Sequence, residues 1–213
     1  MGPGPAPVAK ARRSGPEAPD AGRTAQGPGL VIQHMDFEYQ PVLKGELVEL
    51  RPLRADDYEA LYAVASDPGI WEQHPAVDRY QEAVFREFFQ EALACGGTLV
   101  AVDAEDGRVI GSSRFHDYDA GRREVEIGWT FLARSHWGGR YNGEMKRLMC
   151  EHAFAFVDSV VLLIGMENTR SQRAAERLGA TRAGTRPDAG GRRSWVYHIA
   201  RRTWPRTRAS GQA

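Results

Sequence analysis

The chain has 213 residues, of which 42% are hydrophobic and 9% aromatic, and its formal net charge is zero. A chain of this size can bury one sizeable core but hardly two, and the balanced charge argues against a protein held to nucleic acid by phosphate contacts. No stretch approaches the roughly 20 apolar residues that cross a bilayer. Cys95 and Cys150 are too few for a disulfide framework and suit a reducing compartment. We therefore expect a soluble cytoplasmic protein that binds neither nucleic acid nor membranes.

The two ends of the chain differ in composition from its middle. Residues 1–29 are dominated by Gly, Pro, Ala and charge and offer no apolar face, which predicts a disordered tail. We expect one domain over residues 30–205 and a second disordered tail over 206–213. From Arg182 onward the sequence contains many arginines and a single acidic residue, Asp188. This basic end fits either solvated strand edges or a rim near an anionic ligand.

Apolar spacing predicts the elements of the first half of the chain. Residues 47–50 alternate between apolar and polar ahead of Pro52 and indicate a short strand. Asp56 can cap a helix whose apolar face extends to Ala65. A second helix has its apolar face over 84–93 and stops at two glycines. Three strands in a meander follow, at 98–102, 109–115 and 125–131.

The second half of the chain predicts a crossover. Gly138 and Gly139 lead into a helix with a broad apolar stripe from Met145 to Phe156. Residues 160–164 are apolar on both faces, as in a central buried strand. A short helix over 168–178 and a last strand over 194–200 follow, with one further strand left open. This order predicts an α/β fold, a mixed sheet with helices on both faces.

The segment from Trp137 to Asn142 has the features of an anion site. The chain leaves a strand, passes two glycines and enters a helix, so unpaired N–H groups and the positive end of the helix dipole point outward. Glycine lets an anion approach the backbone more closely than a Cβ would permit, and Arg134, Arg140 and Lys146 can add positive charge. The alternative is a plain turn, since glycine pairs are common in loops. Neither a P-loop nor a G-x-G-x-x-G motif is present.

Four segments together resemble a known family: EVEIGWTFL, RSHWGGRYN, VVLLIG and ENTRSQRAAERLGA. They resemble the GCN5-related N-acetyltransferase (GNAT) family, and within it the ribosomal-protein-acetylating type of RimJ and RimL, over about residues 43–204. The strongest matches are Glu126, Ile127, Gly128 and Trp129 on one strand, residues 137–141 in the loop, and Asn168, Ser171, Ala174 and Gly179 around the last helix.

The resemblance implies acetyl-coenzyme A (acetyl-CoA) as co-substrate, with no metal. The loop would bind its pyrophosphate, and pantetheine would lie where the family's fourth and fifth strands splay apart. The implied cofactor-binding residues are Thr130, Phe131, Leu132, Arg134, Gly138, Gly139, Arg140, Tyr141, Asn142, Asn168 and Arg173. The connection between the first two helices borders the acceptor pocket in the family, which implies Trp71, Glu72 and His74 as substrate-binding residues; the alternative is a packing tryptophan in a polar loop.

Four positions depart from the family pattern. Aligned on Tyr141, Trp137 stands where the loop usually has Gln or Arg, and Asn142 stands where it usually has Gly or Ala. Arg140 stands where the loop usually has a glycine, and Gly138 and Gly139 supply conformational freedom shortly before it. Ala175 stands where the last helix usually carries a tyrosine general acid, so a tyrosine acid at that place is excluded.

Glu126 and Ser171 remain for catalysis. An amine of pKa near 10 arrives as an ammonium ion and must lose a proton before it attacks a thioester, and Glu126 is the expected base. Its alternative is an ordinary solvent-facing carboxylate. Ser171 could protonate the departing thiolate, or serve as a helix N-cap. His136 could act on the acceptor, whereas His152 shares an apolar helix face and is expected to pack.

The expected function is N-acetyl transfer from acetyl-CoA to a primary amine, by direct attack in a ternary complex. The acceptor is either a small-molecule amine or a protein N-terminus, and the protein is a monomer or a homodimer. The alternative is a catalytically degenerate member of the fold that binds acyl-CoA or a partner without turnover. The six histidines are scattered without the spacing of zinc ligands, and neither cysteine has a His and carboxylate arrangement for covalent catalysis.

Overall fold

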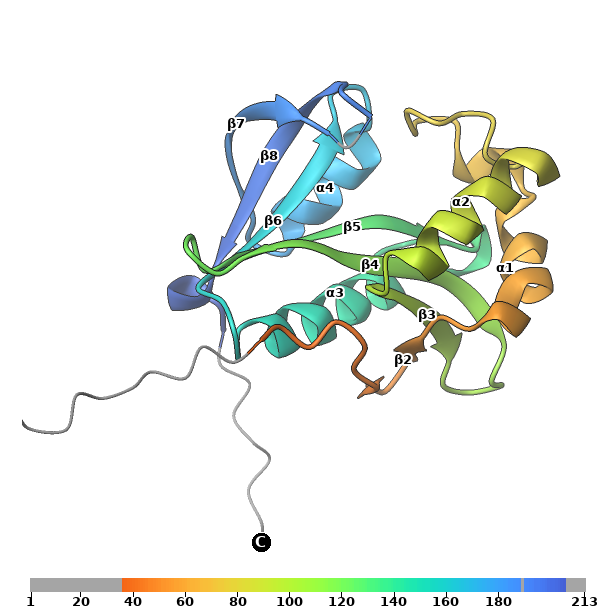
Figure 1. The fold of residues 1–213 in the computed structure, drawn as a ribbon, viewed down its shortest axis with the longest axis horizontal. Helices are drawn as coiled ribbons and strands as arrows, with labels where there is room; N and C mark the ends of the chain where they lie inside the picture. Colours follow the sequence, from red (N-terminus) through yellow and green to blue (C-terminus); the bar gives the residue numbers. More distant parts are fainter. Residues whose placement is uncertain (1–35, 189, 206–213) are drawn as a thin grey trace, which may run out of the picture. The chain divides into compact units, whose positions relative to one another are not determined.

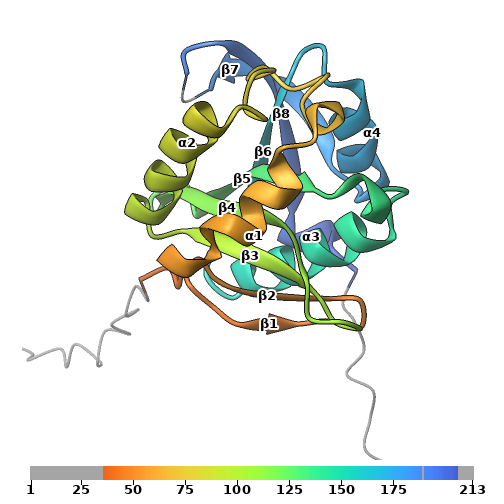
Figure 2. The ribbon, with the colours of Figure 1, turned by 90° about the vertical axis from the view of Figure 1, so that its right-hand side faces the viewer.

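The computed structural model describes residues 36–188 and 190–205. The expected tails over 1–29 and 206–213 lie outside the described residues. Eight strands of the described part form one mixed sheet in the order β1-β2-β3-β4-β5-β6-β8-β7 (Figures 1 and 2). Their bounds are β1 (Leu43–Lys44), β2 (Val48–Pro52), β3 (Thr98–Asp103), β4 (Val109–Asp119), β5 (Glu124–Leu132), β6 (Ser159–Gly165), β7 (Thr181–Pro187) and β8 (Arg193–Ala200).

Helices cover both faces of this sheet, as predicted (Figure 2). They are α1 (Tyr58–Ala65), α2 (Glu82–Ala94), α3 (Arg140–Ala153) and α4 (Thr169–Arg177). Alternation along β3 divides the core between the faces, because successive side chains of a strand point to opposite sides. Leu99 and Ala101 pack in the core of α3 and α4, whereas Val100 packs in that of α1 and α2.

The two-residue strand β1 was not expected from the sequence, and local details differ from the expectation at three further places. Asp56 does not cap α1: it lies in a 3-10 turn, and its neighbour Asp57 accepts a hydrogen bond from the Arg54 N–H at 2.8 Å. Helix α3 ends at Ala153, so Phe156 belongs to the turn after it. The strand that the sequence left open is β7, which pairs with the last strand, β8.

The sheet opens between its two central strands. β5 and β6 are parallel and pair only at Glu124↔Ser159, Val125↔Val160 and Glu126↔Val161. Beyond Glu126, β5 remains paired with β4 and β6 with β8, so the facing edges of β5 and β6 part. A bulge sharpens this departure, because Trp129 has a φ of 49° and Trp129 and Thr130 together stand opposite Ser113.

Candidate active site

A cavity of about 290 Å³ lies where β5 and β6 part. This volume is near the lower end of the range of about 300–1,000 Å³ found for ligand pockets. Its walls come from both strands, from the α1–α2 connection, from the amino end of α3, from one face of α4 and from the β7–β8 loop. Segments far apart in the chain therefore meet around one space.

The amino end of α3 opens onto this cavity. Gly138 and Gly139 have φ angles of 104° and 103°, a conformation that L-residues with a side chain rarely adopt. No side chain caps the helix, whose first residue is Arg140. Both glycines line the cavity, and apart from their chain neighbours no described residue comes within 4 Å of the point where their Cβ atoms would stand. The first N–H groups of α3 thus form an open cradle with positive potential.

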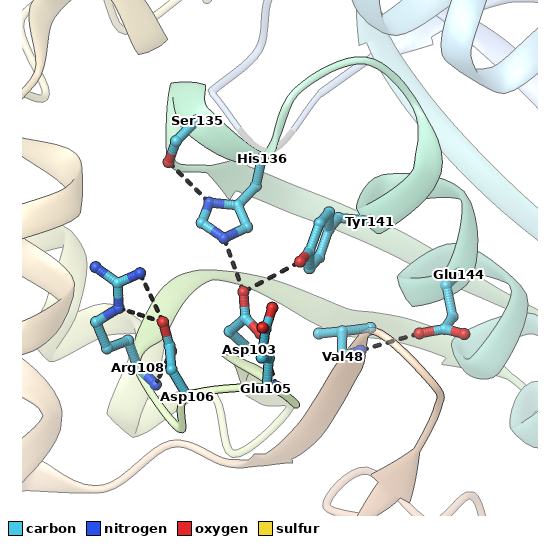
Figure 3. A network of polar contacts seen from close by, with 9 residues as sticks. All are labelled: Val48, Asp103, Glu105, Asp106, Arg108, Ser135, His136, Tyr141 and Glu144. Carbon is cyan, nitrogen blue, oxygen red and sulfur yellow. Dashed lines mark hydrogen bonds and ion pairs between the residues drawn. The ribbon is translucent and has the colours of Figure 1, made fainter.

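The carboxylate of Asp103, the last residue of β3, holds both ends of this loop (Figure 3). His136, just before the loop, places Nε2 2.9 Å from Oδ2 of Asp103, and the Tyr141 hydroxyl, just after it, donates to the same oxygen at 3.2 Å. The two rings lie 4.6 Å apart. The N–H of Glu105, with the donors on His136 and Tyr141, holds the pKa of Asp103 below its usual range. One anchored carboxylate therefore fixes the cradle against the sheet.

Glu126 is a buried carboxyl on the cavity wall, with 7% of the residue exposed. Burial raises its pKa to about 7, although Arg186, with Nη2 3.9 Å from Oε2, favours the charged form. The alternative of an ordinary solvent-facing carboxylate is wrong, because this side chain is buried within the wall of the cavity. A buried carboxyl with this pKa can take up and release a proton near neutral pH.

Lys146 is the buried cation of α3 and also lines the cavity. Its Nζ donates to Oγ of Ser113 at 3.1 Å and to Oγ1 of Thr130 at 2.5 Å. Burial lowers its pKa to about 8. The amine therefore binds two hydroxyl groups of β4 and β5 and joins α3 to the bulged part of the sheet.

The amino end of α4 is capped by Asn168, whose Oδ1 accepts from the Ser171 N–H at 3.1 Å. Ser171 is therefore not the N-cap. It lines the cavity instead. Ala175, at the family's tyrosine position, lines the same wall. Ser171 is the hydroxyl that α4 supplies to this face.

Residues 48–181 match the family model described as an acetyltransferase (GNAT) domain. The chain belongs to the GNAT acetyltransferase family. Solved structures similar to it include a GCN5-related N-acetyltransferase from Brucella melitensis, at 21% identity, over 80% of this chain and 83% of that one, with a TM-score of 0.70. An acetyltransferase (GNAT family) from Bacillus anthracis is similar at 21% identity, over 75% and 98%, with a TM-score of 0.63.

A third similar structure is Mycobacterium smegmatis RimJ in complex with CoA-disulfide, at 20% identity, over 75% of this chain and 85% of that one, with a TM-score of 0.58. No curated protein matches the sequence. The fold and the family expected from the sequence are confirmed.

Most of the GNAT cofactor positions named from the sequence meet at the cavity. The members that line it are Thr130, Phe131, Leu132, Gly138, Gly139, Asn142 and Asn168. The side chains of Arg134, Arg140, Tyr141 and Arg173 are not on its wall. Arg134 instead pairs with Asp67 at 2.5 Å, and Tyr141 contacts Asp103.

Arg173 and Ser171 cannot both face the cavity, because residues two apart on a helix point in opposite directions. The face of α4 that lines the cavity carries Arg170 and Arg177, at helical spacing from Ala174. The sequence interpretation missed both arginines, although this spacing could have found them. Arg170 donates to the Ile70 carbonyl at 2.9 Å and stacks on the Trp137 ring at 4.0 Å, beside the glycine loop.

Of the expected acceptor residues, Trp71 and His74 line the cavity and Glu72 does not. Trp71 is almost fully buried, and its indole N–H donates to the Ala65 carbonyl at 2.7 Å, so packing fixes it. Burial, with help from nearby arginines, lowers the pKa of His74 to about 3 and keeps it neutral. Arg79 and Arg192 line this part of the cavity too, and the sequence interpretation did not assign them to it.

Cys150 and His152 do not line the cavity. Cys150 is fully buried in α3, and burial raises its pKa to about 12, which disfavours the thiolate. His152 packs among aromatic rings, as expected, and contacts the Glu38 carbonyl at 2.7 Å. Over residues 36–188 and 190–205, no cluster of His, Cys, Asp and Glu side chains could hold a metal ion. Nor does any helix of that part have the length and apolar character to cross a membrane.

Proposed function

We propose that this GNAT protein transfers the acetyl group of acetyl-CoA to a primary amine by direct attack in a ternary complex. The observation that carries the proposal is the convergence on one cavity of a buried carboxyl, Glu126, and the open amino end of α3 after Gly138 and Gly139. A base and an anion cradle in one space are what an amine acetyltransferase requires.

The residues around the cavity fit acetyl-CoA. The N–H groups at the start of α3 would hold its pyrophosphate, since Gly138 and Gly139 leave the backbone open to a close approach. Arg170 lies beside this loop and can add positive charge. The unpaired edges of β5 and β6 offer hydrogen-bonding groups to pantetheine. When bound, acetyl-CoA supplies a thioester, an acyl group activated for attack.

Glu126 serves as the general base in this proposal. The acceptor amine is mostly protonated at neutral pH, because its pKa is near 10. A carboxyl with a pKa of about 7 accepts that proton, directly or through a water molecule. The backbone N–H groups of β5 beyond Glu126 are left without β6 partners and can stabilise an oxyanion.

Ser171 serves as the proton donor to the departing thiolate. Its place on the cavity wall supports this role, as does the absence of a hydroxyl at Ala175. A thiol has a pKa near 8.5 and leaves readily, so a weak acid suffices. The acceptor is a small-molecule amine or a protein N-terminus. We place the activity in the cytoplasm, in line with the two free cysteines.

A thiol-release assay tests the function. The protein is incubated with acetyl-CoA and an amine panel, and free thiol and acetylated amine are measured, while calorimetry measures acetyl-CoA binding in parallel. Amine-dependent release in equal amounts with acetylated product supports the proposal. Tight binding without any release supports instead the degenerate acyl-CoA binder, and absence of acetyl-CoA binding contradicts both acetyl transfer and acyl-CoA binding.

A further inference from the structure

One arginine on the cavity wall is held by aromatic rings instead of by a carboxylate. Arg79, in the α1–α2 connection, places its guanidinium 4.3 Å from the centre of the Phe88 ring and 5.1 Å from that of Trp71. Within the described part of the chain, its guanidinium makes no hydrogen bond or ion pair. By contrast, Arg170 and Arg192 donate to carbonyl groups, of Ile70 and Pro75. Arg79 thus presents its N–H donors to the cavity.

The surroundings of Arg79 are cationic. Arg114 lies 5.7 Å from the centre of the same Phe88 ring, and its buried Nη2 has no hydrogen-bond partner among the described residues. Burial lowers the pKa of Arg79 to about 10, with further lowering by Arg114 and Arg192, and only partial compensation by Glu91 and Asp78. Neutral His74 adds no negative charge.

The cavity as a whole has the same imbalance. Two carboxyl groups on its wall, Glu126 and Asp188, face a larger set of cations: Arg79, Lys146, Arg170, Arg177 and Arg192. Asp188 is engaged within its own loop, where its Oδ1 accepts from the N–H groups of Gly190 and Arg192 at 2.9 Å each and its Oδ2 lies 3.7 Å from Nε of Arg192. Arg192 is therefore partly neutralised, whereas Arg79 has no such partner among the described residues. A polycationic amine would meet repulsion here, whereas an oxyanion would be attracted.

The cations divide into two groups around the cavity. Arg170 stacks on Trp137 beside the glycine loop and so lies near the expected phosphate cradle. Arg192 belongs to the β7–β8 loop and binds the Pro75 carbonyl at 2.8 Å, which brings it to the α1–α2 connection that carries Arg79. The second group, Arg79 and Arg192, is therefore associated with the acceptor side.

We propose that Arg79, assisted by Arg192, binds an oxyanion of the acceptor, so that the substrate is an amine that also carries a carboxylate or a phosphate, and not a polyamine. This inference rests on the proposed function, because it names the acceptor class of the same cavity. A planar guanidinium can bind either oxyanion through two parallel N–H···O bonds.

The test compares amines that differ only in the anionic group. The pairs are L-ornithine and putrescine, L-tryptophan and tryptamine, and O-phosphoethanolamine and ethanolamine. Equilibrium binding of each is measured by calorimetry with and without coenzyme A, and kcat/KM by thiol release. In at least one pair, we expect the amine with the anionic group to bind at least about tenfold more tightly than the amine without it. This is the size expected for a charge-assisted hydrogen bond. The carboxylate and phosphate pairs show which oxyanion is preferred.

Variants connect that preference to Arg79. Arg79→Met keeps an unbranched side chain on the aromatic rings and is expected to remove the preference for the anionic member, with coenzyme A affinity unchanged. Arg79→Lys keeps the charge and is expected to restore part of it. Arg122→Met, which removes an exposed arginine paired with Asp119 at 3.5 Å, is the matched control and leaves the preference intact.

Three results would overturn the inference: equal or tighter binding of the decarboxylated or dephosphorylated members by wild type, binding of no member, or an unchanged preference in Arg79→Met. The wild-type comparison needs no variant, so it decides even if Arg79→Met fails to fold. If the wild-type protein does not bind coenzyme A, the proposed function is contradicted as well. If it binds coenzyme A but shows no preference for the anionic amines, only this inference is contradicted.

Discussion

Nε2 of His136 lies 2.9 Å from Oδ2 of Asp103, across 33 residues of sequence, and this contact joins the segment before the glycine loop to the end of β3. The Tyr141 hydroxyl reaches the same oxygen from the segment after the loop. The cradle is consequently held from both ends by a single side chain.

Asp103→Asn tests this arrangement, because the amide keeps the shape but cannot accept from both donors with the strength of a carboxylate. We expect coenzyme A affinity to fall by about tenfold, the size of one lost hydrogen bond to a charged group. Asp106→Asn is the control, since Asp106 pairs with Arg108 on the neighbouring turn (Figure 3). Calorimetry of both variants checks this, and equal affinities would show that the loop does not depend on Asp103.

Gly139→Val tests the cradle itself. A β-branched residue at a φ of 103° strains the backbone, and its side chain would stand where an anion approaches the N–H groups of α3. We expect coenzyme A affinity to fall by about tenfold or more, as for loss of a hydrogen bond to a charged group. Gly107→Val carries comparable strain at a φ of 75°, away from the cavity, and serves as control. If both variants bind coenzyme A like wild type, the phosphate site lies elsewhere.

Glu126→Gln removes the proposed proton acceptor and keeps the size of the side chain. Because the pKa of Glu126 is raised by burial to about 7, wild-type kcat/KM is expected to rise through neutral pH as this carboxyl ionises. The variant lacks that rise, and at pH 8 we expect turnover to fall by about 10²-fold or more with coenzyme A affinity retained. Near pH 10 the free amine is abundant, so the variant partly recovers.

Glu124→Gln is the matched control for this experiment. Glu124 lies on the same strand and also faces Arg186, at 3.5 Å, but it is not on the cavity wall. Its pH profile is expected to keep the rise through neutral pH, moved slightly to lower pH because the Glu124 charge contributes to the raised pKa of Glu126. Superimposable profiles for wild type and Glu126→Gln would remove Glu126 from the mechanism and leave proton removal to His136 or to water.

Glu126→Gln also has a predicted effect on stability. The pKa of this carboxyl is raised from 4.5 to about 7 in the folded protein, which therefore holds the proton more tightly than the unfolded chain does. The free energy of unfolding consequently falls as pH rises through this interval. At pH 8 the variant is therefore expected to exceed wild type by about 1–3 kcal/mol in the free energy of unfolding. The difference shrinks below pH 4.5. Urea denaturation at pH 4 and pH 8 measures it, and a variant less stable at pH 8 would contradict the sign.

Substitutions of Asn168 and Ser171 are expected to have different effects, one on stability and the other on turnover. Asn168→Ala removes the cap of α4 and is expected to cost about 1 kcal/mol of stability. Ser171→Ala leaves the cap in place, so we expect unchanged stability and a fall in kcat that is smaller than the roughly 10²-fold typical of general acid catalysis, because a thiol leaves readily. Thermal unfolding and thiol release are measured on both. A stability loss in Ser171→Ala without a change in kcat would make it a structural residue.

Periodicity in the sequence was sufficient for the fold. The two-residue alternation of the strands and the helical spacing of Met145, Leu148 and Met149 follow from local geometry, so the four α-helices and six of the eight strands were found within a few residues, whereas β1 was not predicted and β7 was left open. Glycine at 138 and 139 predicted a turn into a helix for the same reason, since backbone freedom belongs to the residue itself. Glu126 was found as the candidate base through the family resemblance.

Only the tertiary structure decided which side chains reach the cavity. Asp103 holds the glycine loop and Arg79 reaches the acceptor side through contacts between segments far apart in sequence, which no local pattern encodes. The same holds for the raised pKa of Glu126, because its burial depends on the distant segments that meet around the cavity. Arg173 and Arg170 have equal charge in the sequence, and the direction in which α4 packs on the sheet places Arg170 at the cavity and Arg173 away from it.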